Sequence, residues 1–366
     1  MVVPPKPQVS GIAPYVAGKS AEEMAAEYGV APESIIKLGS NENPYGPSPR
    51  VVEAIQRAAP SVHVYPSYSM DTLKKGLAEY VGTVPERVLP TAGMDGLIEV
   101  VLRAFVQDGD EVIITSPTFS YYAIASAASG AKVVHVPREG FEVDADGVLE
   151  SATERTKVVF VCSPNNPSGN TTPSETIAEI AQSLDAVVFV DEAYVEFASH
   201  SSLSELDGLD NVVVGRTLSK AFGLAGLRVG YGVLSDVVMD ACLRVATPFA
   251  VSSLAQAAAV QALEDLDYVR ECVARIRHNR ELLYDIPFTT YPSDANFVLV
   301  NVAPLTAAEV CEMLLKRGII VRDCTSFQGL GETYVRISVG TREQTKRVVD
   351  AMREVYSEQK SDERVI

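Results

Sequence analysis

The chain has 366 residues, of which 47% are hydrophobic and 22% charged, so it can bury a large core and form two domains. Its formal net charge is −17 and no basic run exceeds two residues, which argues against nucleic-acid binding through phosphate neutralisation. The five cysteines are scattered without a CxxC pair and the four histidines are dispersed, a pattern that predicts a reducing compartment, no disulfide framework and no metal site.

Residues 1–37 are expected to form an N-terminal arm. The segment is rich in proline at first and then suggests a short helix, which we expect to pack against a smaller C-terminal domain. The opening MVVPPKPQVSG lacks the apolar segment of a signal peptide, and no stretch approaches the length of a membrane span. We therefore expect a cytoplasmic protein that does not contact membranes.

Residues 38–270 are predicted to form a large α/β domain. Seven β-branched runs without polar alternation predict strands buried on both faces of a mostly parallel sheet. Helical patterns lie between several of these runs, and ligands of such open sheets bind beyond the carboxyl ends of the strands. The strand runs are RVLPTAG, EVIITSP, KVVHVP, KVVFVCSP, AVVFVDEAY, VVVGRTLSK and LRVGYGVL, and the helices are expected at 94–105, 121–128, 173–184 and 237–245.

Residues 271–366 are predicted to form a smaller α+β domain. Residues 254–283 carry one long helical pattern without proline or glycine, which predicts a helix that bridges the two domains. Beyond Phe288 the pattern alternates between short strands and helices, with a last helix from Thr341. The strand runs there are ANFVLVNV, GIIVRD and TYVRISVG, with a helix between the first two at 307–316.

Polar and aromatic groups follow several of the strands expected in the large domain. Taken singly, each has a plain structural explanation: Asp191 as a helix cap, Asn166–Pro167 as a turn, Phe119 as core and Lys220 as a surface charge. Taken together they are complementary, because the carboxyl ends of parallel strands meet at one edge. In chain order these groups are Gly93, Met94, Phe119, Asn166, Asp191, Tyr194, Ser219, Lys220 and Arg228.

This set suits pyridoxal 5′-phosphate (PLP). The cofactor's aldehyde needs a lysine for a Schiff base, and its ring nitrogen needs a buried carboxylate in order to stay protonated. Lys220 and Asp191 supply these groups, and Tyr194 and Asn166 supply donors for the 3′-oxygen. Amides at a helix start, a hydroxyl and a guanidinium suit the phosphate, and they are found at Gly93, Met94, Ser219 and Arg228.

The chain closely resembles fold-type I PLP-dependent aminotransferases, class II subfamily, and among them the histidinol-phosphate aminotransferase family. The resemblance covers nearly the whole length and implies a large domain with a mostly parallel central sheet between helices, plus a smaller α+β domain. It implies transamination of L-histidinol phosphate with 2-oxoglutarate, giving imidazole-acetol phosphate and L-glutamate in histidine biosynthesis. The blocks that carry it are LGSNENPYGPSP, VYPSYS, SPNNPSG, DEAYVEF, RTLSKAFGLAGLRVGY and VRISVGTRE.

The resemblance also implies roles for individual residues. Lys220 would be the Schiff-base lysine and the acid/base of the proton shift, with Asp191 and Tyr194 as the other catalytic groups. Phe119 would stack on the cofactor ring, where many relatives carry tyrosine. Tyr65 would reach the cofactor phosphate of a neighbouring subunit, which makes the active unit a homodimer.

Four further residues are expected to bind substrate. Arg336 would hold the α-carboxylate of glutamate, and Arg322 and Arg336 together would hold the phosphate of the amino substrate. Tyr15 and Asn43 would line the same pocket. The plain structural explanation for Arg322 is a surface strand charge, but the apolar GIIV before it favours a buried setting that needs a partner.

Two other functions remain compatible with the sequence, and two more are disfavoured. A threonine-phosphate decarboxylase of cobalamin synthesis shares the cofactor groups and a phosphorylated substrate, and VRDCTSFQGLGETYVR resembles that family too. An aromatic amino-acid aminotransferase would differ in specificity. A catalytically silent PLP-binding regulator is disfavoured by the retained lysine, carboxylate and arginines, and a Rossmann dehydrogenase by the lack of a GxGxxG after any strand.

Overall fold

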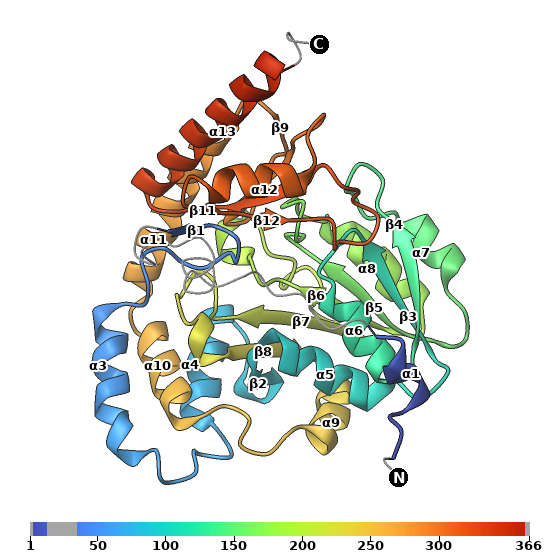
Figure 1. Cartoon of the computed structure of the whole chain (residues 1–366). Coiled ribbons are helices and arrows are strands. Elements are labelled where there is room, and N and C mark those ends of the chain that lie inside the picture. Colours follow the sequence, from blue (N-terminus) through green and yellow to red (C-terminus); the bar gives the residue numbers. More distant parts are fainter. Residues whose placement is uncertain (1–2, 13–34, 363–366) are drawn as a thin grey trace.

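A computed structural model describes residues 3–12 and 35–362 (Figure 1). Its centre is a seven-stranded sheet with the order β2-β8-β7-β6-β5-β3-β4, in which β8 runs antiparallel to both neighbours and the other pairs are parallel. All seven predicted strands are present, and the α/β fold class is confirmed. The strands are β2 (Val88–Ala92), β3 (Glu111–Ser116), β4 (Lys132–Pro137), β5 (Thr156–Cys162), β6 (Val187–Asp191), β7 (Val212–Thr217) and β8 (Val229–Leu234).

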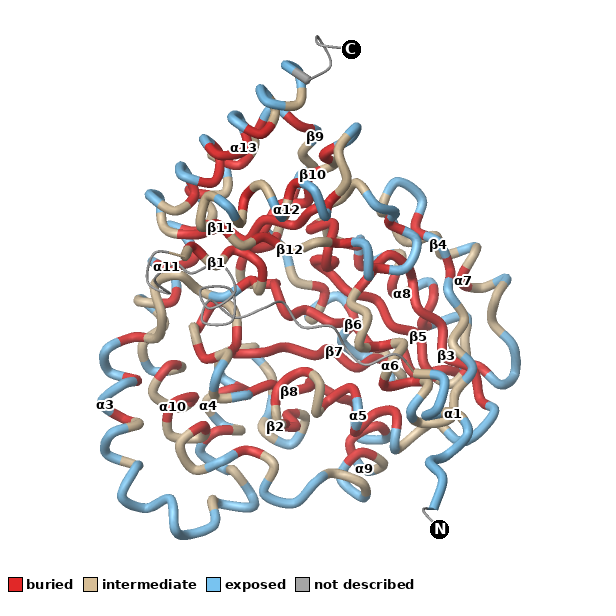
Figure 2. Tube along the Cα trace, in the orientation of Figure 1, coloured by how far each residue is buried: buried red, intermediate tan, exposed pale blue. Residues whose placement is uncertain are grey.

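Two apolar clusters explain why valine-rich runs form this sheet. Side chains alternate between the two faces of each strand, and both faces are covered. Phe189 of β6 packs on the side of α5 (Gly93–Phe105) and α6 (Tyr121–Ala128). Val188 and Val190 pack on the side of α7 (Ala145–Ser151) and α8 (Ser174–Ser183). In Figure 2 the central strands are accordingly almost entirely buried, and the exposed residues lie on the outer helices and loops.

The helices around the sheet confirm the four predicted positions to within one residue. Several start at a side-chain cap, for example Ser235, whose hydroxyl accepts a hydrogen bond from the Val238 amide at 3.4 Å. The α-helices of this part are α3 (Pro49–Ala58), α4 (Asp71–Val81), α5 (Gly93–Phe105), α6 (Tyr121–Ala128), α7 (Ala145–Ser151), α8 (Ser174–Ser183) and α9 (Asp236–Val245). The short 3₁₀ helices are η2 (Ala59–Ser61), η3 (Pro85–Arg87), η4 (Val195–Phe197) and η5 (Ala225–Leu227).

The single helix predicted over 254–283 is wrong. The segment forms α10 (Ser253–Leu263), α11 (Leu266–Arg280) and the 3₁₀ helix η6 (Glu281–Asp285). The chain leaves helical geometry at Asp265, whose carboxylate accepts a hydrogen bond from the Ser48 hydroxyl at 2.5 Å. This tertiary contact with the start of α3 interrupts a pattern that has no glycine or proline to mark the break.

The expected burial of every strand on both faces is also wrong for β4. Its Lys132, His135 and Pro137 are exposed, because β4 is the last strand of the sheet and pairs with β3 alone. A charged and partly exposed edge strand discourages pairing with other chains. The β-branched residues of β4 resemble those of the central strands, so the sequence alone did not show that β4 lies at the edge of the sheet.

The C-terminal part forms a second, antiparallel sheet with the order β12-β13-β10-β9. Helix α12 begins at a capping box, in which Thr306 and Glu309 exchange hydrogen bonds. The strands are β9 (Thr289–Thr290), β10 (Phe297–Asn301), β12 (Arg322–Asp323) and β13 (Tyr334–Ser338), and the helices are α12 (Ala307–Leu315) and α13 (Arg342–Asp362).

The N-terminal segment contacts both parts of the molecule. Helix α1 (Pro7–Ser10) lies against α6 of the large sheet, whereas β1 (Ile36–Lys37) pairs in parallel with β11 (Ile319–Ile320). The domain boundary expected at residue 270 falls inside α11. Over the described ranges, no helix is long and apolar enough to cross a membrane, and no cluster of histidine, cysteine and acidic side chains could hold a metal ion.

Candidate active site

A cavity of about 210 Å³ lies at the carboxyl edge of the large sheet. The ends of β2, β3, β5, β6 and β7 and the start of β8 meet there, because β8 is the one reversed strand of this sheet. Eight of the residues expected to bind a cofactor line this cavity. They are Met94, Phe119, Asn166, Asp191, Tyr194, Ser219, Lys220 and Arg228, and Cys162, Ala193, Thr217, Ala225 and Asp95 complete the wall.

Lys220 follows β7 and points its amine into the cavity. The Nζ atom donates to the Ser40 carbonyl at 3.4 Å and lies 5.7 Å from the centre of the Tyr194 ring. Burial lowers the pKa of Lys220 to about 8, and the positive charge of Arg336 adds to this effect. About a tenth of the amine is therefore neutral and nucleophilic at pH 7, far more than for an ordinary lysine.

Asp191 is the last residue of β6 and is buried. Its Oδ1 accepts a hydrogen bond from the Ala193 amide at 2.9 Å, and its Oδ2 accepts one from the Tyr122 hydroxyl at 2.5 Å. Burial raises the pKa of Asp191 to about 6, while the two hydrogen bonds favour the ionised form. The carboxylate thus faces the cavity in a fixed orientation.

An amide and a phenol stand beside the lysine, each held by a partner outside the cavity. The Asn166 carbonyl oxygen accepts from Nη1 of Arg336 at 2.5 Å, so its NH₂ group is left to donate. The Tyr194 hydroxyl accepts from Nδ2 of Asn41 at 3.1 Å, and burial raises its pKa. The phenol therefore keeps its proton and can donate it in a hydrogen bond.

An anion-binding cradle closes the other end of the cavity. Helix α5 begins at Gly93, so its free amides and its dipole point there. Gly93 has a positive φ of 76°, a conformation that favours glycine, and a Cβ atom there would lie 2.8 Å from Nη2 of Arg228. The Ser219 hydroxyl lies on the same wall, and Arg228 forms an ion pair with Asp95 at 2.9 Å.

The donor set fits PLP. The cavity offers one amine for an aldehyde, one carboxylate for a protonated ring nitrogen, and an amide and a phenol for a ring oxygen. Its cradle combines helix-start amides, a hydroxyl and a guanidinium, which is the chemistry that a phosphate requires. Phe119 on the cavity wall adds the apolar face that a flat ring needs.

Three more of the predicted site residues lie outside this cavity, namely Arg322, Asn43 and Tyr65. Arg322 lines a neighbouring cavity of about 380 Å³ that shares Phe119 with the first. Both polar atoms of the Asn43 side chain bond to backbone, namely the Ala221 carbonyl and the Tyr45 amide, so Asn43 braces the loop that carries Lys220. Tyr65 is 80% exposed.

Tyr15 lies outside the described residues. Arg336 donates a hydrogen bond to Asn166 of the cavity wall, and its Nη2 also donates to the Gly39 carbonyl at 2.7 Å. Arg336 and Arg322 are direct partners in the antiparallel pairing of β12 with β13.

Sequence reasoning missed several residues of the site. Asp95 stands in the first turn of α5. It was missed because a negatively charged side chain is not expected beside a phosphate-binding group. Asn41 has a positive φ of 54° and reaches Tyr194 across 153 positions of sequence, so no local pattern reveals it. Tyr122 follows Phe119 at helical spacing, which is the one feature that could have suggested it.

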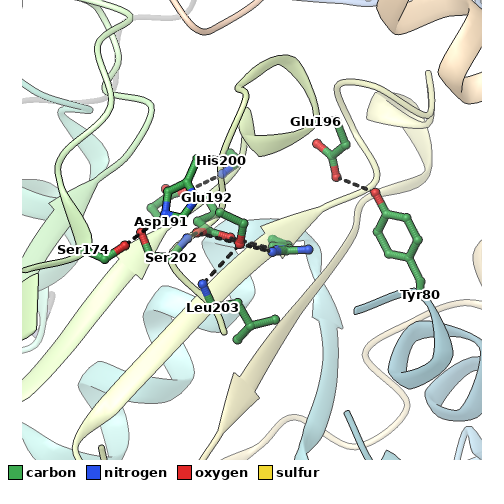
Figure 3. Close-up of polar contacts among 11 residues, drawn as sticks. Tyr80, Ser174, Asp191, Glu192, Glu196, His200, Ser202 and Leu203 are labelled. Carbon is green, nitrogen blue, oxygen red and sulfur yellow. Dashed lines mark hydrogen bonds and ion pairs between the residues drawn. The ribbon is translucent and has the colours of Figure 1, made fainter. Parts of the chain in front are cut away.

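A buried polar network lies directly behind the strand ends (Figure 3). Glu192, next to Asp191, accepts from Nε of Arg216 at 2.9 Å and from the Ser202 amide at 2.7 Å. Nearby, the Tyr80 hydroxyl donates to Glu196 at 3.3 Å, and burial raises the pKa of Glu196 to about 7. The Glu192–Arg216 pair ties β6 to β7, and so fixes Asp191 relative to the strand that leads to Lys220.

Comparison with known proteins gives concordant matches. A family model described as aminotransferase class I and II matches residues 33–352. The chain is 48% identical to the histidinol-phosphate aminotransferase of Methanosarcina mazei, covering 94% of this chain and 95% of that protein. It is 42% identical to the enzyme of the same name from Methanocaldococcus jannaschii, covering 95% and 96% of the two chains.

Solved structures agree with the sequence comparison. The chain is similar to the crystal structure of histidinol-phosphate aminotransferase from Sinorhizobium meliloti in complex with PLP, with a TM-score of 0.85 and 28% identity over 95% of this chain and 97% of that one. A double mutant of the Thermus thermophilus aspartate aminotransferase gives a TM-score of 0.83 and 25% identity over 97% of this chain and 100% of that one.

Proposed function

Since the chain belongs to the class I and II aminotransferases, we propose that it transfers the amino group of L-histidinol phosphate to 2-oxoglutarate, with PLP as its cofactor. The products are imidazole-acetol phosphate and L-glutamate, a step of histidine biosynthesis. The relatives that are 41–48% identical over nearly the whole chain all carry the name of this activity, which supports the proposal.

The cofactor would be held by groups at the strand ends. When bound, PLP supplies an electron sink for the carbon that loses its proton. Asp191 would pair with the ring nitrogen, and Asn166 and Tyr194 would donate to the 3′-oxygen. The α5 amides of Gly93 and Met94, the Ser219 hydroxyl and Arg228 would bind the phosphate.

Lys220 would act twice. Its amine, with a pKa lowered to about 8, would hold the cofactor through its aldehyde, and the neutral form of the amine is the one suited to this role. The same Nζ would also move the proton between the substrate Cα and the cofactor. The Ser40 carbonyl, 3.4 Å from Nζ, helps to hold the amine beside the cavity while it moves this proton.

The observation that supports a phosphorylated substrate is the pairing of Arg322 with Arg336 across β12 and β13. Two positive charges directly opposite each other repel, and an anion between them removes that repulsion. Arg336 is only 5% exposed and sits beside the cavity, so it suits the carboxylate of glutamate as well. Together the two arginines would form a clamp for a dianionic phosphate.

The active unit would be a cytoplasmic homodimer. Each subunit would have a large domain of residues 38–270, a small domain of residues 271–366 and the arm of residues 1–37. Tyr65 is exposed, and its ring lies 4.9 Å from that of Phe249, which is itself partly exposed. This projecting position suits a tyrosine that reaches the phosphate in a partner's site.

A coupled assay tests the proposal. Purified protein loaded with PLP is offered L-histidinol phosphate with 2-oxoglutarate, and separately O-phospho-L-threonine. We expect glutamate from the first mixture and no carbon dioxide from the second. Carbon dioxide from phosphothreonine, without glutamate from histidinol phosphate, would make the chain a decarboxylase. Equal rates with phosphorylated and free aromatic amino compounds would make it a general aromatic aminotransferase.

A further inference from the structure

Tyr122 is a buried tyrosine that the proposed mechanism does not use. It lies in the first turn of α6, and its side chain is completely buried. Its hydroxyl donates a hydrogen bond of 2.5 Å to Oδ2 of Asp191, across 69 positions of sequence. Tyr122 does not line the cavity, so it acts on the site only through its neighbours.

Two aromatic contacts fix where that hydroxyl points. The Tyr122 ring stacks on Phe160 of β5 with 4.6 Å between ring centres and an angle of 7°. Its edge meets Phe119, the aromatic wall of the cavity, at 5.5 Å and 88°. The ring is therefore held between the sheet and the cavity wall, with its hydroxyl directed at Asp191.

The contact matters because Asp191 is only 3% exposed. A buried carboxylate loses its hydration and needs hydrogen-bond donors in order to stay charged. The Ala193 amide donates a hydrogen bond to Oδ1, and the Tyr122 hydroxyl donates one to Oδ2. A carboxylate has about four lone-pair positions, so both oxygens can still accept a bond from the cavity side.

We propose that Tyr122 is a positioning residue that holds the Asp191 carboxylate in the orientation and charge state required by the ring nitrogen of PLP. This inference rests on the proposed function, because it assumes PLP in the cavity. Through its edge contact with Phe119, the same side chain also sets the wall against which the cofactor ring lies.

The chain offers a matched control on the same helix. Tyr121 also donates its hydroxyl to a carboxylate, at 2.6 Å, but its partner is the exposed Glu99 of α5. Tyr122→Phe and Tyr121→Phe therefore remove the same atom from adjacent positions. Both variants keep their rings, so the packing of Tyr122 on Phe160 is retained.

The experiment measures the affinity of the apo-proteins for two probes, PLP and 1-deazapyridoxal phosphate, in which a C–H group replaces the ring nitrogen. We expect Tyr122→Phe to weaken PLP binding about ten- to a hundredfold, the usual loss for one hydrogen bond to a charged group. The deaza probe has no ring nitrogen to pair with Asp191, so its affinity should change less than about threefold. Tyr121→Phe should match the wild type with both probes.

A second comparison uses the Asp191→Asn background. There Tyr122→Phe should change PLP affinity by less than about threefold, because the charged acceptor is already gone. Thermal unfolding of the apo-proteins shows whether the variants fold.

Each outcome has one interpretation. Equal losses for PLP and the deaza probe, or an undiminished loss in the Asp191→Asn background, would show that Tyr122 is merely structural and would overturn the inference. PLP binding equal to the wild type in Tyr122→Phe would do the same. If the folded wild-type protein binds no PLP, the proposed function fails, and the inference fails with it.

Discussion

The carboxyl edge of the large sheet and the small antiparallel sheet hold their site residues differently. Asp191 is buried and Lys220 is half-buried at the ends of parallel strands, and each has a hydrogen bond to a protein group that orients it. Of the two arginines opposite each other on β12 and β13, Arg336 is as buried as Asp191, whereas Arg322 is half-buried and lines a separate cavity. The strand ends around one cavity suit chemistry common to all substrates, whereas Arg322, at its separate cavity, suits the choice among them.

Replacing Lys220 should have the largest effect. We expect Lys220→Ala to lower turnover at least about a thousandfold, because one amine provides both covalent attachment and proton transfer. The variant should still bind PLP without a covalent bond, since Arg228, Ser219 and the α5 amides are unchanged. Steady-state rates and the visible spectrum of the bound cofactor measure both effects. Lys346→Ala, which removes an exposed lysine of α13, is the control, and sustained turnover by Lys220→Ala would remove Lys220 from the mechanism.

Asp191→Asn should have the next largest effect. The substitution keeps the shape but removes the buried charge opposite the ring nitrogen, so we expect turnover to fall about a hundred- to a thousandfold. Thermal unfolding should change little, because burial already penalises the charged form of this carboxylate, with its pKa raised to about 6. Asp267→Asn, at a 95% exposed side chain, is the control. A loss of less than about tenfold would assign the pairing role to another group.

Arg322→Ala sharpens the comparison between the two sheets. We expect the KM for L-histidinol phosphate to rise about ten- to a hundredfold, the loss of one charge-assisted bond to phosphate. Glutamate should be affected much less, because Arg336 alone would hold its α-carboxylate. Stopped-flow half-reactions with each amino donor measure the two effects, with the exposed Arg347→Ala as control. Equal losses for both donors, or no loss for either, would leave Arg322 as a structural charge.

The smallest expected effect is the pH dependence of cofactor attachment. The neutral amine of Lys220 is the reactive form, and its pKa is lowered to about 8. The rate at which apo-protein attaches PLP should therefore rise with pH, level off above about pH 8, and be roughly tenfold lower at pH 7 than at its maximum. Visible absorbance after rapid mixing gives the rate. A rate that keeps rising up to pH 10 would mean that burial does not lower the pKa of this amine.

The strands of the large sheet and the residues at their ends were predictable from the sequence. Apolar runs such as VVFV define strands, and a polar residue directly after a run marks the edge where ligands bind. Asp191 and Lys220 were therefore identified by their place in the chain. The fold class and the family followed from the same motifs and are confirmed.

Contacts between distant segments were not predictable. The break at Asp265 depends on Ser48, and the hydrogen bond that supports Tyr194 depends on Asn41, which lies 153 positions earlier in the sequence. The edge position of β4 depends on which strand lies beside it, and a β-branched run does not encode this. These features arise from packing in three dimensions, for which a single sequence has no local signature.

Borohydride reduction tests the central claim most directly, since it fixes PLP permanently to the amine that holds it. Wild-type protein loaded with PLP is reduced either directly or after mixing with L-histidinol phosphate in the absence of a keto acid, and its peptides are mapped by mass spectrometry. We expect the cofactor on the peptide that contains Lys220 in the first sample. In the second sample it should leave as pyridoxamine phosphate, with Lys220 unmodified. Modification of a different lysine, or full retention of the cofactor on Lys220 after histidinol phosphate, would contradict the account.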